Sequence, residues 1–228
     1  MIISIHQPDY IPYMGYFYKI AQSDVFVFLD DAQFSSDNMH HWNRIKTPQG
    51  ECRLKIPVEN KLGYKINQVR TKDELNWKEK HLKTIEMNYS KALYFKDIFP
   101  QIKEIILSTY TSLADQNIAI NMFICKGFCL NKKFISSSEL GINTTKETRV
   151  IDICKALGGT KYISGNGAKA YQINEHFEQR NLELVYTDYK PFEYLQVWKE
   201  FTPNMSILDY IFNCGFDWDK IDKTMRGN

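Results

Sequence analysis

Residues Met1–Asp31 read MIISIHQPDYIPYMGYFYKIAQSDVFVFLDD, and this stretch decides the fold. It opens with the apolar run Met1–Ile5, which predicts a buried strand, and the run stops at the turn-prone segment His6–Pro12. Apolar side chains then recur at helical spacing over Tyr13–Ala21, and a second apolar run, Val25–Leu29, follows. The stretch therefore predicts one β-turn-α-β unit of a parallel sheet.

Four polar side chains follow the two predicted strands: His6 and Gln7 after the first, and Asp30 and Asp31 after the second. A right-handed crossover places the carboxyl ends of two parallel strands side by side, and open α/β sheets bind ligands at this edge. We therefore predict a functional site here. For each residue alone the alternative is a structural role, because single histidines and paired aspartates after a strand often serve only a turn.

The composition favours one domain and excludes several classes of protein. A chain of 228 residues, 43% of them hydrophobic, is large enough for a sizeable core. A net charge of +2 without a long run of one sign argues against a nucleic-acid or membrane-surface protein. We expect no signal peptide and no bilayer-spanning segment, and the odd number of cysteines, five, favours reduced thiols and a cytoplasmic location.

Residues 32–75 are predicted to form an insertion that contains a β-hairpin. After a Thr-Pro-Gln-Gly turn, Cys52 and Leu54 alternate with basic residues, which is the pattern of a half-exposed strand. Asn43 and Arg44 stand before this hairpin. The guanidinium of Arg44 is a candidate clamp for a phosphate or carboxylate, and a surface ion pair is the alternative.

Residues 76–130 are predicted to form a helical segment. Trp77 and His81 lie on one face of its first helix, where His81 either packs among aromatic residues or points into a pocket. Residues 94–130 continue as an isoleucine-rich helical region broken only at Pro100. We interpret this region as two helices that cover a face of the sheet.

A second α/β half runs from a strand at Phe134–Ser138 to a strand at Leu182–Tyr186. Between them lies a strand that ends at Ser164, followed by a turn with Gly165 and Gly167 and the start of a helix. Such glycines let backbone N–H groups approach an anion, and a tight structural turn is the alternative. The whole pattern predicts an α/β fold: a mostly parallel open sheet with helices on both faces, a hairpin insertion and a helical segment.

Several motifs occur in a fixed order along nearly the whole chain: His6–Pro12, Gly15–Phe17, Asp24–Asp31, Asn43–Arg44, Trp77 with His81, Tyr162–Gly165 with Tyr171, Gln196, and Phe201–Asp209. Together they resemble the WbqC-like family of bacterial polysaccharide-cluster proteins. The resemblance implies an accessory enzyme of surface-glycan synthesis, including O-antigen synthesis, that transfers an acyl or aminoacyl group to an amino sugar.

In such a transfer the incoming amine must lose a proton, and His6 is the candidate general base, with Asp30 or Asp31 orienting its imidazole. Gln7, Asn43 or the amides of residues 165–167 are candidate donors to the oxyanion or to a phosphate. The acceptor would be a small-molecule amino sugar, which a nucleotide can carry, and the donor a thioester of coenzyme A or of an acyl carrier protein. The candidate substrate-binding residues are Gln7, Tyr10, Asn43, Arg44, His81, Ser164, Gly165, Gly167, Tyr171 and Gln196.

Two other functions stay open at this point. A nucleotidyltransferase-like enzyme would need Asp30 and Asp31 to hold Mg²⁺, whereas the transfer mechanism assigns no metal ligand. A non-catalytic protein would bind a sugar or a carrier without turnover. The acyl group, the acceptor and the oligomeric state do not follow from the sequence.

Overall fold

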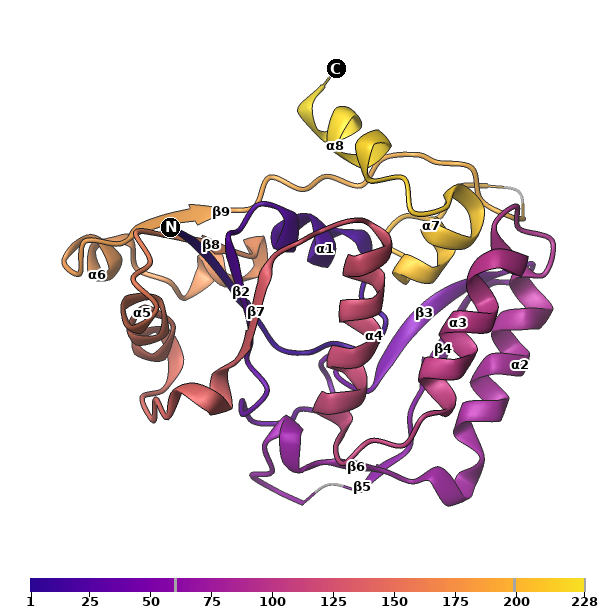
Figure 1. Cartoon of the computed structure of the whole chain (residues 1–228), viewed down its shortest axis with the longest axis horizontal. Helices are drawn as coiled ribbons and strands as arrows, with labels where there is room; N and C mark the ends of the chain where they lie inside the picture. The colour runs from indigo at the N-terminus through magenta and orange to yellow at the C-terminus, as the bar shows by residue number, and fades with distance from the viewer. Residues whose placement is uncertain (60, 199, 228) are drawn as a thin grey trace.

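The computed structural model describes residues 1–59, 61–198 and 200–227 and contains a five-stranded sheet, which lies in the left half of Figure 1. All its strands run parallel in the order β7-β2-β1-β8-β9, so the first strand of the chain lies in the middle. The strands are β1 (Ile2–His6), β2 (Val25–Phe28), β7 (Lys133–Ser136), β8 (Lys161–Ser164) and β9 (Glu183–Tyr186). The predicted α/β fold class is confirmed.

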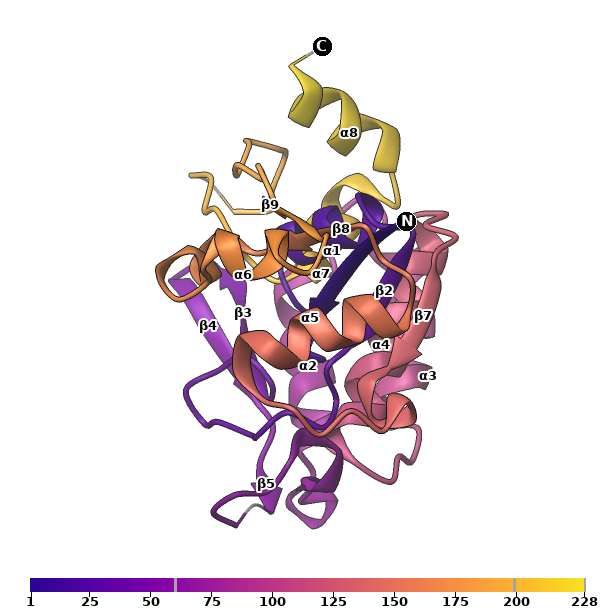
Figure 2. The ribbon, with the colours of Figure 1, turned by 90° about the vertical axis from the view of Figure 1, so that its left-hand side faces the viewer.

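Helices cover both faces of this sheet. They are α1 (Met14–Ala21), α5 (Lys146–Ala156) and α6 (Asn174–Glu178). Successive strand residues point to opposite faces, so Val25 and Val27 pack in the cluster with α5 and α6, and Phe26 packs on the side of α1, 5.5 Å from the ring of Tyr16. Figure 2 looks from the side of α5 and shows α5 in front of β1 and β2.

The predicted insertion forms a hairpin outside the main sheet, as expected. Asn43 and Arg44 lie within its first strand, not before it. The antiparallel pairs are β3 (Trp42–Thr47) with β4 (Gly50–Lys55), and β5 (Val58–Glu59) with β6 (Arg70–Thr71). Short 3₁₀ helices are η1 (Ile66–Gln68), η2 (Asp73–Leu75), η3 (Ser137–Leu140) and η4 (Asn166–Ala170).

The helical segment differs from its prediction in two ways. Its helices are α2 (Trp77–Tyr89), α3 (Phe95–Leu107) and α4 (Leu113–Gly127). Pro100 lies inside α3, whose buried face continues past the proline. Phe95 and Phe99 stack before it with ring centres 4.5 Å apart, and Ile102 and Ile106 are buried after it. The second difference is that α3 lies away from the sheet and packs on α7 through Phe95 and Phe212 (Figure 1). Phe128, which follows the last residue of α4, packs on Phe17 of α1.

The chain ends with a long connection and two helices, α7 (Ile207–Cys214) and α8 (Trp218–Arg226). In the connection, the ring of Tyr189 packs beside Tyr13 on the α1 side, and the amide of Gln196 meets Nζ of Lys46 on the hairpin at 2.9 Å. The connection therefore ties the sheet half to the hairpin half. Within the described ranges, no helix combines the length and apolar character needed to cross a membrane.

Candidate functional site

The order of the sheet reverses between β1 and β8. From β1 the chain passes to β2 and β7 on one side, whereas β8 and β9 lie on the other side. At the carboxyl ends of β1 and β8 lies a cavity of about 710 Å³, which we call the switch-point cavity. This is where open α/β sheets bind ligands, and the volume suits a small molecule. Predicted site residues that line it are His6, Gln7, Ser164, Gly165, Gly167 and Tyr171.

His6 ends β1, and its half-buried ring packs edge-on against Tyr16 with ring centres 4.9 Å apart. Its Nδ1 lies 3.1 Å from the carbonyl oxygen of Gln7. That oxygen can only accept, so Nδ1 carries the hydrogen and Nε2 is left as the basic atom of the ring. Burial lowers the pKa of His6 well below its ordinary value, and the charge of Lys19 lowers it further. The imidazole is therefore neutral at pH 7 and able to accept a proton.

Asp9, which was not among the predicted site residues, is the carboxylate that approaches His6. Its Oδ2 lies 3.7 Å from Nδ1 of His6, and its Oδ1 lies 4.0 Å from Nε2 of His40. Burial raises the pKa of Asp9 to about 7. The signal was present in the sequence, since Asp9 stands three residues after His6 in the same turn.

Asparagine side chains hold the loop that follows β1. The amide nitrogen of Asn43 donates to the carbonyl oxygens of Tyr10 and Ile11, both at 3.0 Å. From α4, Asn117 donates to Pro8 O at 2.8 Å, and a second asparagine one turn later donates to the next carbonyl of the loop. Ile11 adopts a φ of +38°, a strained value for a β-branched residue. Asn43 therefore fixes the loop and does not line the cavity.

Asp30 and Asp31 form a separate cluster at the ends of β2 and β7. Asp30 accepts hydrogen bonds from the backbone nitrogen and hydroxyl of Ser138 at 3.0 and 2.6 Å, and Asp31 pairs with Arg149. Neither carboxylate lines the switch-point cavity. Among the residues that the structure describes, no group of three or more His, Cys, Asp or Glu side chains could hold a metal ion. The structure thus brings Asp9, and not this pair, to the imidazole of His6.

The other predicted binding residues support the hairpin and the C-terminal helix. The hydroxyl of Tyr10 meets Nδ1 of His81 at 3.0 Å in the interior. Arg44 pairs with a glutamate across the hairpin at 2.7 Å, which is the surface ion pair given above as the alternative. Gln196 donates to the buried carboxylate of Asp209 at 2.7 Å. None of these side chains lines the switch-point cavity.

The sequence analysis also missed a buried cation in the cavity wall. Lys19 lies on α1 with 3% of its surface exposed, and its Nζ donates to the carbonyl oxygen of Ile5 at 3.0 Å. Burial lowers the pKa of Lys19 to about 7. One signal could have found it, because Lys19 is the only charged residue of α1 and stands between Tyr18 and Ile20.

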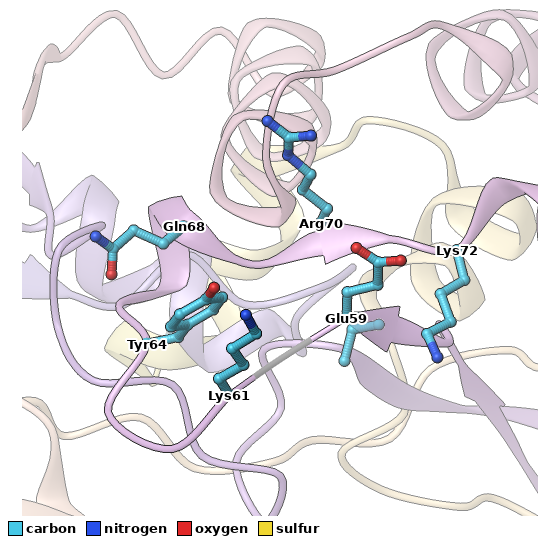
Figure 3. A pocket seen from close by; sticks show the side chains of 7 residues that line it. Glu59, Lys61, Tyr64, Gln68, Arg70 and Lys72 are labelled. Carbon is cyan, nitrogen blue, oxygen red and sulfur yellow. The ribbon is translucent and has the colours of Figure 1, made fainter.

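A second hollow, of about 600 Å³, lies beside the β5-β6 pair. Figure 3 shows Lys61 and Tyr64 next to each other, Glu59 between Lys61 and Lys72, and Arg70 pointing away from them. Its charged groups do not converge on one point, and it contains none of the predicted site residues. The switch-point cavity is therefore the candidate site.

Comparisons with known proteins identify a family and a relative. A sequence model of the WbqC-like protein family matches residues 7–221. The chain is 32% identical over 217 residues to the uncharacterized protein Rv1507c of Mycobacterium tuberculosis, a match that covers 93% of this chain and 94% of that protein. No solved structure matches significantly. The chain belongs to the WbqC-like protein family.

Proposed function

We propose that the protein is an acyl or aminoacyl transferase that acts on an amino sugar in the switch-point cavity, with His6 as general base. One observation carries this proposal. The hydrogen bond from Nδ1 of His6 to Gln7 O leaves Nε2 free to accept a proton, and His6 stands at the carboxyl end of the central strand in the cavity wall.

The chemistry of the transfer fits the groups around His6. The amine nitrogen attacks the thioester carbonyl, and its proton passes to Nε2 of His6. The carbon–sulfur bond then breaks, and Nε2 returns this proton to the sulfur, so that a thiol leaves and the imidazole is neutral again. Asp9 stabilises the imidazolium that forms, as the carboxylate of a catalytic triad does. The rings of Tyr162 and Tyr171 and the side chains of Ile5 and other apolar residues supply surface for a sugar or a base.

The donor in this proposal is a thioester of coenzyme A or of an acyl carrier protein, and the acceptor is a nucleotide-linked amino sugar of surface-polysaccharide synthesis. Membership of the WbqC-like family supports the pathway. The five cysteines are all free, which supports a cytoplasmic site for the reaction.

The first experiment combines binding and turnover. Nucleotide-linked amino sugars, coenzyme A thioesters and ATP with Mg²⁺ are screened by thermal shift, since a ligand at ~100 Kd stabilises by about 2.7 kcal/mol. Pairs that bind are then assayed for transfer by mass spectrometry. We expect transfer to fall about 10²-fold or more in His6→Ala and in His6→Asn, which keeps a donor for Gln7 O but removes the base.

Other outcomes would select the alternatives. Transfer within a few-fold of wild type in both His6 variants would exclude His6 as the base. A shift with ATP and Mg²⁺ alone, lost in Asp30→Asn, would favour a nucleotide-processing enzyme. Sugar binding that His6→Ala weakens, with no turnover for any pair, would indicate a non-catalytic binding protein.

A further inference from the structure

Lys19 is held rigidly against the central strand. Its ammonium donates to Ile5 O at 3.0 Å, and its own carbonyl oxygen accepts from the hydroxyl of Ser4 at 3.3 Å. The side chain is almost fully buried, yet it belongs to the wall of the switch-point cavity. An ammonium has three N–H groups, and Ile5 O takes one of them.

No carboxylate forms an ion pair with Lys19 in the part of the chain that the structure describes. Glu147, also in the cavity wall, instead accepts from the backbone nitrogen of Ile173 at 2.7 Å and pairs with His176. Asp9 acts on Lys19 only at a distance, and its own pKa is raised to about 7 by burial. A buried ammonium without a contacting anion is costly, and bound anions relieve that cost.

Another part of the cavity lining offers bare backbone. Gly165 and Gly167 follow β8 and line the cavity, and a Cβ built at either position would meet no atom within 4 Å. An anion can therefore approach the backbone of this turn closely. Lys146, at the start of α5, adds a second cation to the cavity lining.

We propose that Lys19 and the turn at Gly165–Gly167 form the phosphate-binding site of the switch-point cavity, which holds the diphosphate of a nucleotide-linked substrate. The substrate class rests on the proposed function. Lysine is a common phosphate ligand, and diphosphates bind at the crevice beside the first strand of open α/β sheets. In this arrangement Lys19 holds the substrate while His6, at the end of β1, accepts the proton.

The test measures the binding of uridine diphosphate, inorganic pyrophosphate and uridine by calorimetry. The variants are Lys19→Met, which removes the charge at similar size, and Lys96→Met, a matched control on the exposed face of α3. We expect Lys19→Met to weaken uridine diphosphate and pyrophosphate binding at least tenfold, and Lys96→Met to leave both unchanged. Uridine, which lacks phosphate, should not respond to the loss of Lys19.

Three results would overturn the proposal. They are wild-type affinity for both phosphates in Lys19→Met, no binding of either by the wild-type protein, and an equal loss of uridine binding. If Lys19→Met does not fold, Gly165→Ala decides, because its methyl group enters open space and should weaken phosphate binding without straining the fold. His6→Ala should still bind uridine diphosphate, so a failure of the transfer reaction and a failure of this site are distinguishable.

Discussion

At the scale of single residues, His81 shows how burial fixes a protonation state. Its Nε2 faces Lys55 O at 3.3 Å, which can only accept, so Nδ1 is unprotonated and accepts from the hydroxyl of Tyr10. Burial lowers the pKa of His81 to about 4, whereas an unfolded histidine titrates near ~6.5. Between these values the unfolded chain binds a proton that the folded chain does not bind. Stability therefore falls as the pH drops from about 6.5 to about 4.

The prediction is that His81→Gln makes this acid destabilisation shallower, by up to about 1.4 kcal/mol per pH unit within that window. Urea unfolding at several pH values between 8 and 4 measures it. Comparing slopes removes the cost of the altered hydrogen bonds, which is present at pH 8 as well. An unchanged slope would show that His81 is already charged in the folded protein.

The position of single residues at the edge of the sheet was easier to predict from the sequence than the side chains that contact them. His6 and Gln7 could be assigned to the cavity because they follow an apolar run directly. The partner of His6 could not, since the strand-end argument pointed to the pair after β2, whereas the approach of Asp9 depends on loop geometry. That geometry is set by Asn117, which lies 109 positions from its partner Pro8. Contacts at such separation leave no periodic signal.

At the scale of elements, α3 continues through Pro100, because the packing of its apolar face outweighs the cost of a proline inside the helix. Proline in a helix interior lacks the N–H for the turn before it and costs about 3 kcal/mol relative to alanine. Its side chain in α3 is exposed, so replacing it removes no buried contact. We expect Pro100→Ala to raise the free energy of unfolding by about 2 kcal/mol, after allowing for the greater freedom of the unfolded chain.

Denaturant unfolding measures this change, and Pro48→Ala in the β3-β4 turn is the matched control. Proline restricts the unfolded chain at both positions, but Pro48 lies outside any helix, so its replacement should bring no gain. A loss of stability in Pro100→Ala would show that α3 is shaped around the proline. The helical spacing correctly predicted a helix in this region, but the predicted break at Pro100 was wrong.

The packing partner of α3 was also predicted incorrectly, because the apolar pattern of a helix does not identify its neighbour. An apolar stripe indicates that a helix buries one face, but it does not indicate which element packs against that face. Here α3 meets α7 from the C-terminal part of the chain, through Phe95 and Phe212. The strands were predicted more reliably. A parallel sheet with helices on both faces buries both sides of each strand, so each strand appears in the sequence as a continuous apolar run.

At the scale of the whole molecule, two buried clusters meet at the sheet. The larger cluster extends from Phe26 across α1 and α4 to the hairpin and α7, and the smaller one joins Val25 and Val27 to α5 and α6. Because neighbouring residues of β2 belong to different clusters, neither cluster can open without disturbing the central strands. The switch-point cavity is lined by Ile5 and Tyr162 of the smaller cluster and by Lys19 of α1, a helix whose apolar residues belong to the larger cluster.

This arrangement predicts a single cooperative unfolding transition, as expected for one domain. Cys125 on α4 belongs to the larger cluster and Cys154 on α5 to the smaller, and burial raises the pKa of both thiols to about 12. In a background with Cys52, Cys129 and Cys214 replaced by serine, the labelling of each thiol after incubation in urea reports the opening of its own cluster. The two labelling midpoints should coincide with each other and with the loss of helical circular dichroism. If Cys154 became reactive at a lower urea concentration than Cys125, the cluster around α5 would unfold separately. The protein would then consist of two folding units, with the cavity between them.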